Sequence, residues 1–189
     1  MTHLPTNQLR DRGKNARQRL DDDLHAKYSH AICRRFLSSG LFYRSKTIAC
    51  YLSFASEVDT CTIFDHAWRA RKSVFVPVIG DGSEMRFVQI KRNTRLELNT
   101  FGIWEPVSGS EISAKKLDVV ATPLAAFDEN CNRIGMGGGY FDRCFHFLRS
   151  PRQWSHPKLA GIAFECQRVE KIRPNPWDIR LYRVFTESN

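Results

Sequence analysis

The sequence predicts an α/β fold in which a largely parallel sheet is flanked by helices. Apolar runs typical of buried strands occur at 47–52, 73–78, 119–125 and 158–164. Segments with helical periodicity separate several of these runs, and strands that alternate with helices are typical of parallel sheets. The chain of 189 residues can bury a sizeable core, and its length suits a single domain over residues 1–189.

A basic helix is predicted near the N-terminus, over about residues 14–39. Apolar side chains repeat there at the spacing of one helical face: Leu24, Tyr28, Ala31, Ile32 and Phe36. Gly40 is a suitable residue to end the helix. From the pattern alone, Arg10, Lys14 and Arg17 are interpreted as a solvated helix face.

Two later segments have a less regular pattern. Residues 85–90 predict a strand of mixed character, interpreted as a sheet edge, and residues 99–106 predict a loop that holds aromatic side chains. Leu181, Val184 and Phe185 indicate a last strand.

The composition is that of a soluble protein with a basic surface. Twenty-nine basic and 20 acidic residues give a net charge of +9, which favours anionic ligands such as phosphates, polycarboxylates or nucleic acid. No apolar run approaches the length of a membrane span, and residues 1–14 lack the apolar region of a secretory signal, so a cytoplasmic location is expected. The six cysteines form no CxxC motif and are expected to be buried, reduced thiols.

Residues 133–143 carry the clearest chemistry in the chain. They read RIGMGGGYFDR, follow the apolar run at 119–125 and lead into a segment with helical spacing. Four glycines in five positions allow positive φ angles and a close approach of the backbone to a ligand. Successive N–H groups at a helix start attract anions. The segment is therefore interpreted as a phosphate-binding loop, with an ordinary flexible turn as the alternative.

Two charged residues bracket the glycines. Arg133 can donate to two phosphate oxygens at once, and Asp142 can coordinate a Mg²⁺ that bridges phosphates. The segment fits neither common phosphate motif. Tyr140 stands where a dinucleotide fingerprint requires glycine, and no Gly-Lys-Ser/Thr tripeptide follows.

Four motifs together resemble the 5-formyltetrahydrofolate cyclo-ligase family. The central motif is Pro-x-x-Ala-Phe-Asp at 123–128, followed by Arg-x-Gly-x-Gly-x-Gly-Tyr-Phe-Asp-Arg at 133–143. The other three are YLSFASEVDT at 51–60, FGIWEP at 101–106 and WDIRL at 177–181. Each is weak alone, but all occur in the order typical of the family.

The resemblance implies a fold, an activity and its cosubstrates. The fold would be a Rossmann-like, three-layer arrangement related to sugar-phosphate isomerases and CoA transferases. The activity would be the conversion of 5-formyltetrahydrofolate and ATP, with Mg²⁺, into 5,10-methenyltetrahydrofolate, ADP and phosphate. Phosphoryl transfer depends mainly on positioning and charge neutralisation, which agrees with the lack of a recognisable nucleophile motif.

The resemblance also implies roles for individual residues. The implied ATP contacts are Arg10, Lys14, Arg133, Ile134, Gly135, Met136, Gly137, Gly138, Gly139, Tyr140 and Phe141. The implied folate contacts are Leu52, Glu57, Trp104 and Tyr140. Arg133 and Tyr140 are the implied catalytic residues. Asp142 and Asp178 are the implied Mg²⁺ ligands, so Asp142→Ala is expected to abolish Mg²⁺-dependent turnover and to leave the fold intact.

Two other classes remain open on the sequence: a different α/β enzyme that acts on phosphorylated metabolites, and a basic RNA-binding module. ATP consumption coupled to folate would exclude a different α/β enzyme. Salt-sensitive RNA binding without turnover would favour an RNA-binding module. The expected partners are small molecules, folate (polyglutamylated forms included) and ATP, with no nucleic acid and no membrane, and the expected state is a monomer.

Overall fold

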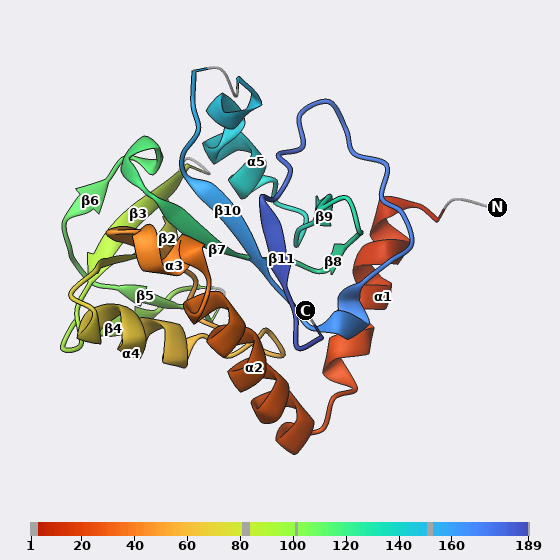
Figure 1. Ribbon diagram of the computed structural model, residues 1–189, viewed down its shortest axis with the longest axis horizontal. Coiled ribbons are helices and arrows are strands. Elements are labelled where there is room, and N and C mark those ends of the chain that lie inside the picture. Colours follow the sequence, from red (N-terminus) through yellow and green to blue (C-terminus); the bar gives the residue numbers. More distant parts are fainter. Residues whose placement is uncertain (1–3, 81–83, 101, 151–152, 189) are drawn as a thin grey trace.

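A seven-stranded sheet forms the centre of the molecule (Figure 1). The computed structural model describes residues 4–80, 84–100, 102–150 and 153–188. The strands of this sheet, in spatial order, are β11 (Arg183–Phe185), β10 (Lys158–Ile162), β7 (Val119–Pro123), β1 (Thr47–Cys50), β2 (Ser73–Ile79), β3 (Met85–Ile90) and β6 (Glu111–Ile112). The first five are mutually parallel, and β3 is antiparallel to both of its neighbours. The predicted α/β class is confirmed.

Helices cover both faces of the sheet, so the fold has three layers. The helices are α1 (Thr6–Gln18), α2 (Asp22–Leu37), α3 (Gly40–Arg44), α4 (Cys61–Arg69) and α5 (Tyr140–Cys144), with 3₁₀ turns η1 (Ala114–Lys116), η2 (His146–Arg149) and η3 (Glu165–Gln167). One core lies between the sheet and α2, α3 and α4, and the other lies under α5 and η2. Val119 and Ala121 face the first core and Val120 faces the second, because side chains alternate along a strand.

The N-terminal region differs from the single helix predicted over 14–39. It forms two helices, because Asp21 leaves the helical conformation and accepts a hydrogen bond from the Leu24 N–H at 2.8 Å as the N-cap of α2. Helix α1 therefore leaves the layer of α2 and packs near the hairpin of β8 (Ala126–Phe127) and β9 (Arg133–Ile134) (Figure 1). This break lets one short helix reach a different part of the molecule.

Three smaller expectations are corrected. Strand β3 is not a sheet edge, because the two-residue strand β6 pairs with its outer side. Part of the loop predicted at 99–106 is strand β5 (Trp104–Pro106), which forms a hairpin with β4 (Leu96–Leu98), and Phe101 lies outside the described residues. All six cysteines are free thiols, but the expected burial holds for Cys33 and Cys50 alone, since Cys131 and Cys144 are half-buried and Cys61 and Cys166 are exposed. In the described ranges, no helix has both the length and the apolar surface needed to cross a lipid bilayer.

Asp128 stabilises the turn between β8 and β9 and is 1% exposed. Its Oδ1 accepts the N–H groups of Asn130 and Asn132 at 3.0 Å each. Its Oδ2 accepts from Asn132 Nδ2 at 2.9 Å and from the Ile172 N–H at 3.0 Å. One carboxylate thus joins the hairpin to a distant segment of the chain.

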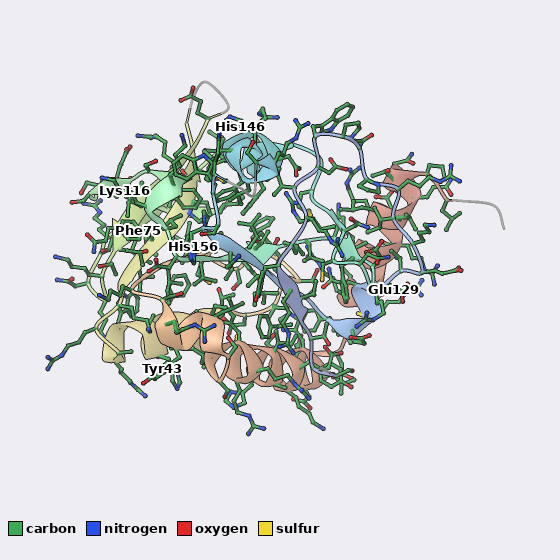
Figure 2. The ribbon with its side chains drawn as sticks, turned by 45° about the horizontal axis from the view of Figure 1, so that its top comes forward. Tyr43, Phe75, Lys116, Glu129, His146 and His156 are labelled. Carbon is green, nitrogen blue, oxygen red and sulfur yellow. The ribbon has the colours of Figure 1, made fainter. Side chains whose placement is uncertain are left out.

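Asp128→Ala is expected to lower the free energy of unfolding by about 3 kcal/mol, because several buried donors lose their acceptor at once. Chemical denaturation would measure the change. Glu129→Ala, at the exposed neighbouring position labelled in Figure 2, is the control and should stay within about 0.5 kcal/mol. Equal stability of the two variants would contradict the role of Asp128.

Candidate functional site

The strand order reverses between β1 and β7. The chain proceeds from β1 to β2 on one side, whereas β7, β10 and β11 lie on the other side. In open α/β sheets, ligands bind outside the carboxyl ends of the strands at this point. The segment after β1 contains Glu57, and the segment after β7 leads through the β8–β9 hairpin to the glycine loop. Both predicted binding segments therefore start from the same edge of the sheet.

The glycine loop, residues 135–139, has a backbone conformation that requires glycine at two positions. Gly137 has φ of +113° and Gly139 has φ of +64°, a region that side chains disfavour. A Cβ atom at Gly138 would lie 2.3 Å from Cε2 of Tyr140, so the loop also packs closely on that ring. Helix α5 has only five residues, and the hairpin separates the loop from β7. The predicted order of strand, loop and helix is thus present in a modified form.

A polar pocket of about 430 Å³ opens beside this loop. The predicted residues in its lining are Arg10, Arg133, Ile134, Gly135, Gly137, Gly139, Asp142 and Asp178. Its other lining residues are Thr6, Arg143, His146, Arg149, Ile172, Arg173, Asn175 and Trp177. We call it the glycine-loop pocket. Five arginines against two aspartates make its wall strongly basic, which suits a polyanion.

The second set of lining residues was not assigned from the sequence. Arg143 and Trp177 stand inside the quoted motifs, so a signal for these two was present. His146, labelled in Figure 2, and Arg149 come from η2, and nothing in their local sequence distinguishes them from surface residues. Of the predicted nucleotide contacts, Lys14, Met136, Gly138, Tyr140 and Phe141 lie outside the lining of this pocket.

Arg133 and Asp142 form an ion pair in the pocket wall. Nη2 of Arg133 lies 2.8 Å from Oδ1 of Asp142, and the two side chains are 4% and 24% exposed. Nη1 of Arg133 donates to the Ile179 carbonyl, and the Ile179 N–H donates to the same Oδ1 of Asp142 at 2.9 Å. Arg133 is therefore engaged with the protein itself, rather than presented freely to a ligand as the sequence suggested.

Asp178 reaches the same pocket from the C-terminal part of the chain. Its Oδ2 accepts from the Asn175 N–H at 2.7 Å and from Asn175 Nδ2 at 3.3 Å. Asp142 and Asp178 thus each bind the protein through one oxygen. Within the described ranges, no cluster of three or more His, Cys, Asp or Glu side chains is arranged to enclose a metal ion. Two carboxylates beside an anion site fit Mg²⁺, which keeps waters and phosphate oxygens as its other ligands.

A second pocket, of about 480 Å³, brings together the predicted folate contacts. Leu52, Glu57 and Trp104 all line it, although Trp104 comes from a different hairpin of the chain. The other lining residues are His25, Ser53, Ala55, Asp59, Cys61 and Leu96. We call it the Glu57 pocket. Tyr140, the remaining predicted folate contact, does not line it; its ring packs against Arg143, whose Cζ lies 5.0 Å from the ring centroid.

Glu57 is a buried residue in the lining of this pocket, with 9% exposure. Its Oε2 accepts the Phe54 N–H at 3.2 Å, and its carbonyl oxygen accepts from Nε2 of His25 at 2.9 Å. Burial raises the pKa of Glu57, while the positive charge of Arg17 and the Phe54 N–H oppose this rise. The carboxylate is therefore held where its charge is costly, which is common at binding sites.

Helix α1 contacts both pockets. Nε of Arg10 donates to the carbonyl of Gly135 at 2.8 Å in the glycine loop. Two turns later, roughly 10 Å along the helix axis, Nε of Arg17 donates to Ser56 Oγ at 3.2 Å beside the Glu57 pocket. Arg17 is buried, so the interpretation of all three basic residues as a solvated face is wrong for it. A basic pocket and a largely apolar pocket that contains a buried carboxylate lie together at the switch point of a parallel sheet, and they define an α/β enzyme domain with two ligand sites.

Comparisons with known proteins identify the family. The sequence profile of the 5-formyltetrahydrofolate cyclo-ligase family matches residues 5–187. The 5-formyltetrahydrofolate cyclo-ligase of Escherichia coli K12 is 38% identical over 148 residues, which cover 75% of this chain and 78% of that protein. The Haemophilus influenzae protein of the same name is 33% identical over 148 residues, with 75% and 76% covered.

A solved structure agrees with the sequence comparisons. The NMR structure of Aquifex aeolicus 5,10-methenyltetrahydrofolate synthetase has a TM-score of 0.84 and 27% sequence identity, and the match covers 98% of this chain and 91% of that one. The chain belongs to the 5-formyltetrahydrofolate cyclo-ligase family. It is accordingly an enzyme of the ligase class, and the resemblance found in the sequence motifs is confirmed.

Proposed function

We propose that this enzyme uses ATP and Mg²⁺ to convert 5-formyltetrahydrofolate into 5,10-methenyltetrahydrofolate. The glycine-loop pocket would hold the triphosphate, and the Glu57 pocket would hold the reduced pterin. The observation that carries this proposal is the sorting of the motif residues into two pockets at one sheet edge, with α1 in contact with both. Membership of the family does not by itself predict that the motif residues divide between two pockets in this way.

On the nucleotide side, the chain supplies positive charge and backbone N–H groups. Arg10, Arg143 and Arg173 line the pocket around the glycine loop, where they would neutralise phosphate charge. Asp142 and Asp178 would hold the Mg²⁺, since each carboxylate uses one oxygen for its hydrogen bonds within the described residues. The metal would neutralise charge on the phosphates. Arg133 acts by orienting Asp142.

The reaction needs activation of a poor leaving group. The γ-phosphoryl group passes to the formyl oxygen, so a P–O bond to ADP breaks and a new P–O bond forms. N10 then attacks the formyl carbon and loses its proton, and the C–O bond breaks with release of phosphate and formation of the cyclic amidinium. No step uses a side-chain nucleophile, so the protein contributes position and charge.

On the folate side, Glu57 would accept hydrogen bonds from the amino and ring N–H groups of the pterin. Leu52 and Trp104 would supply apolar contact on the pocket walls. Trp104 is 49% exposed and Phe54 43% exposed, so both have aromatic surface available to a ligand ring. These are the contacts that would set the position of N5 and N10 relative to the triphosphate.

The direct test mixes the purified protein with 5-formyltetrahydrofolate, Mg²⁺ and ATP and follows the methenyl chromophore. Formation of the chromophore should require both nucleotide and metal, with one ADP released per product. Chromophore formation without ATP, or ATP hydrolysis unaffected by folate, would contradict the proposal.

Glu57→Gln is expected to raise the folate KM by tenfold or more, because a hydrogen bond to a charged group contributes about 1.5–3 kcal/mol. The ATP KM should change less than threefold. Since burial raises the pKa of Glu57, the native kcat/KM for folate should fall as pH drops through this raised pKa, and the acid limb should be absent in the variant. Steady-state kinetics across pH would measure both effects.

Glu97→Gln, which removes an exposed carboxylate on β4, is the matched control and should leave both KM values unchanged. An increase confined to the ATP KM in Glu57→Gln would assign Glu57 to the nucleotide side and contradict the proposed division between the pockets.

A further inference from the structure

Arg17 presents a buried guanidinium at the point where the two ligand-side segments meet. Its side chain is 5% exposed. Nε donates to Ser56 Oγ at 3.2 Å, and Nη1 donates to the Leu124 carbonyl at 3.4 Å. Ser56 belongs to the segment after β1 and Leu124 to the segment after β7, so Arg17 joins them where the strand order reverses.

A buried cation needs compensation, and Arg17 forms an ion pair with the carboxylate of Glu57. Nη2 of Arg17 lies 4.0 Å from Oε1 of Glu57, and the two side chains are 5% and 11% exposed. At this distance the interaction is a charge attraction and not a hydrogen bond. Arg17 can therefore stabilise the ionised carboxylate and still leave Oε1 able to accept a hydrogen bond from a ligand.

The other charged or titratable groups around Glu57 come from neighbouring elements. Nε2 of His25, on α2, donates to the main-chain oxygen of Glu57, so His25 contacts the backbone and not the carboxylate. Tyr51, at the end of β1, is buried, and burial together with the charge of Glu57 raises the pKa of its hydroxyl well above its usual value. Asp59 and Cys61 line the same pocket. Among these described groups, Arg17 is the one that carries a permanent positive charge.

We propose that Arg17 is a positioning residue for substrate binding, which keeps Glu57 ionised and fixes the segment 52–60 against Leu124. The proposal rests on the proposed function, because Glu57 is assigned there to the pterin. It adds that the basic residue responsible lies on α1, outside every motif that led to the family. Arg10 of the same helix faces the nucleotide side, so α1 serves the two pockets with different arginines.

The first experiment measures Glu57 in the ligand-free protein and needs no turnover. The carboxyl of Glu57 is identified in infrared titration difference spectra by comparison with Glu57→Gln. In Arg17→Gln the protonation of Glu57 should move to higher pH, because the opposing positive charge is lost. Arg17→Lys should stay close to the native protein, and Arg12→Gln, on the exposed face of α1, should match it. An unchanged titration in Arg17→Gln overturns the proposal.

The second experiment is kinetic. Arg17→Gln should lower kcat/KM for folate about tenfold at neutral pH and move the acid limb of the pH profile upward, with a much smaller change in the ATP KM. Arg17→Lys should restore most of the loss. Adding Arg17→Gln to Glu57→Gln should cost less than twofold more, since the group it acts on is already neutral. Additive losses in the double variant overturn the proposal.

If Arg17→Gln folds poorly, its melting temperature tests the proposal through the effect of Glu57. The double variant with Glu57→Gln should then melt at a higher temperature than Arg17→Gln alone, because no uncompensated buried carboxylate remains. Equal melting temperatures overturn the proposal. If folate is not turned over by the native protein, the proposed function fails, while the infrared titration and the melting comparison still report on Arg17 and Glu57.

Discussion

Gly13→Ala is expected to impair both halves of the reaction together. A Cβ atom at Gly13 would lie 2.0 Å from the carbonyl oxygen of Ala125 and 3.0 Å from its carbon, and backbone atoms cannot rotate away as a side chain can. Helix α1 would have to retreat from the segment after β7. Because this helix carries Arg10 and Arg17, contacts at the glycine loop and at Ser56 would change at once.

The expected loss is about 100-fold in kcat/KM for both folate and ATP, since a displacement of about 1 Å in a positioning element has this effect. The free energy of unfolding should fall by about 2–3 kcal/mol, as for other overpacked sites. Steady-state kinetics and chemical denaturation would measure the two changes. The loss would occur although alanine has the higher helix propensity, by about 1 kcal/mol.

Asn15→Ala is the matched control, because it places the same residue in the same helix at an exposed position. Its kinetics should be native and its stability equal or slightly higher. Native kinetics and stability in Gly13→Ala itself would mean that the close approach of α1 is not needed for activity.

The role of Gly13 could not be predicted from the sequence, and the reason is physical. The buried residues of α1 are Leu9, Gly13 and Arg17, which follow one another at four-residue spacing. Only one of them is apolar, so hydrophobic periodicity does not mark this face. The strands at 119–123 and 158–162, by contrast, are nearly continuous apolar runs, because parallel strands are buried on both faces. Such runs are readable in any sequence.

In the candidate site, too, some features could be predicted from the sequence and others could not. Leu52, Glu57 and Trp104 gather in one pocket, and the glycine loop, Asp142 and Asp178 gather beside another, as local motifs suggested. The contact of Arg133 with Ile179 joins positions 46 residues apart, and the contact of Arg17 with Leu124 joins positions 107 apart. Residue type and spacing carry no information about such long-range pairs, so the engagement of Arg133 and the burial of Arg17 required the fold.

Asp142→Ala and Asp142→Asn are expected to differ in stability and to agree in activity. Asp142 compensates the buried Arg133 and accepts the Ile179 N–H, so alanine should lower the free energy of unfolding by about 3 kcal/mol. This is the lower end of the range for breaking a buried pair, because the Asp142 side chain is 24% exposed. The sequence-based expectation that Asp142→Ala leaves the fold intact stays a prediction, and the structure adds to it an expected loss of stability. Asparagine keeps an oxygen for the Ile179 N–H and should lose about half as much.

Both variants should lower kcat by about 100-fold or more, because a bound metal contributes several kcal/mol of charge stabilisation in phosphoryl transfer. Asp178→Asn separates the two roles, since the hydrogen bonds that the Asp178 carboxylate accepts within the described residues come from Asn175 in its own turn. It should show the same loss of kcat and weaker binding of Mg²⁺, seen as a higher Mg²⁺ concentration for half-maximal activity. Its free energy of unfolding should change by less than about 1 kcal/mol. Full activity in Asp142→Asn at ordinary Mg²⁺ concentration would remove this carboxylate from the metal site and leave it the structural role of holding Arg133.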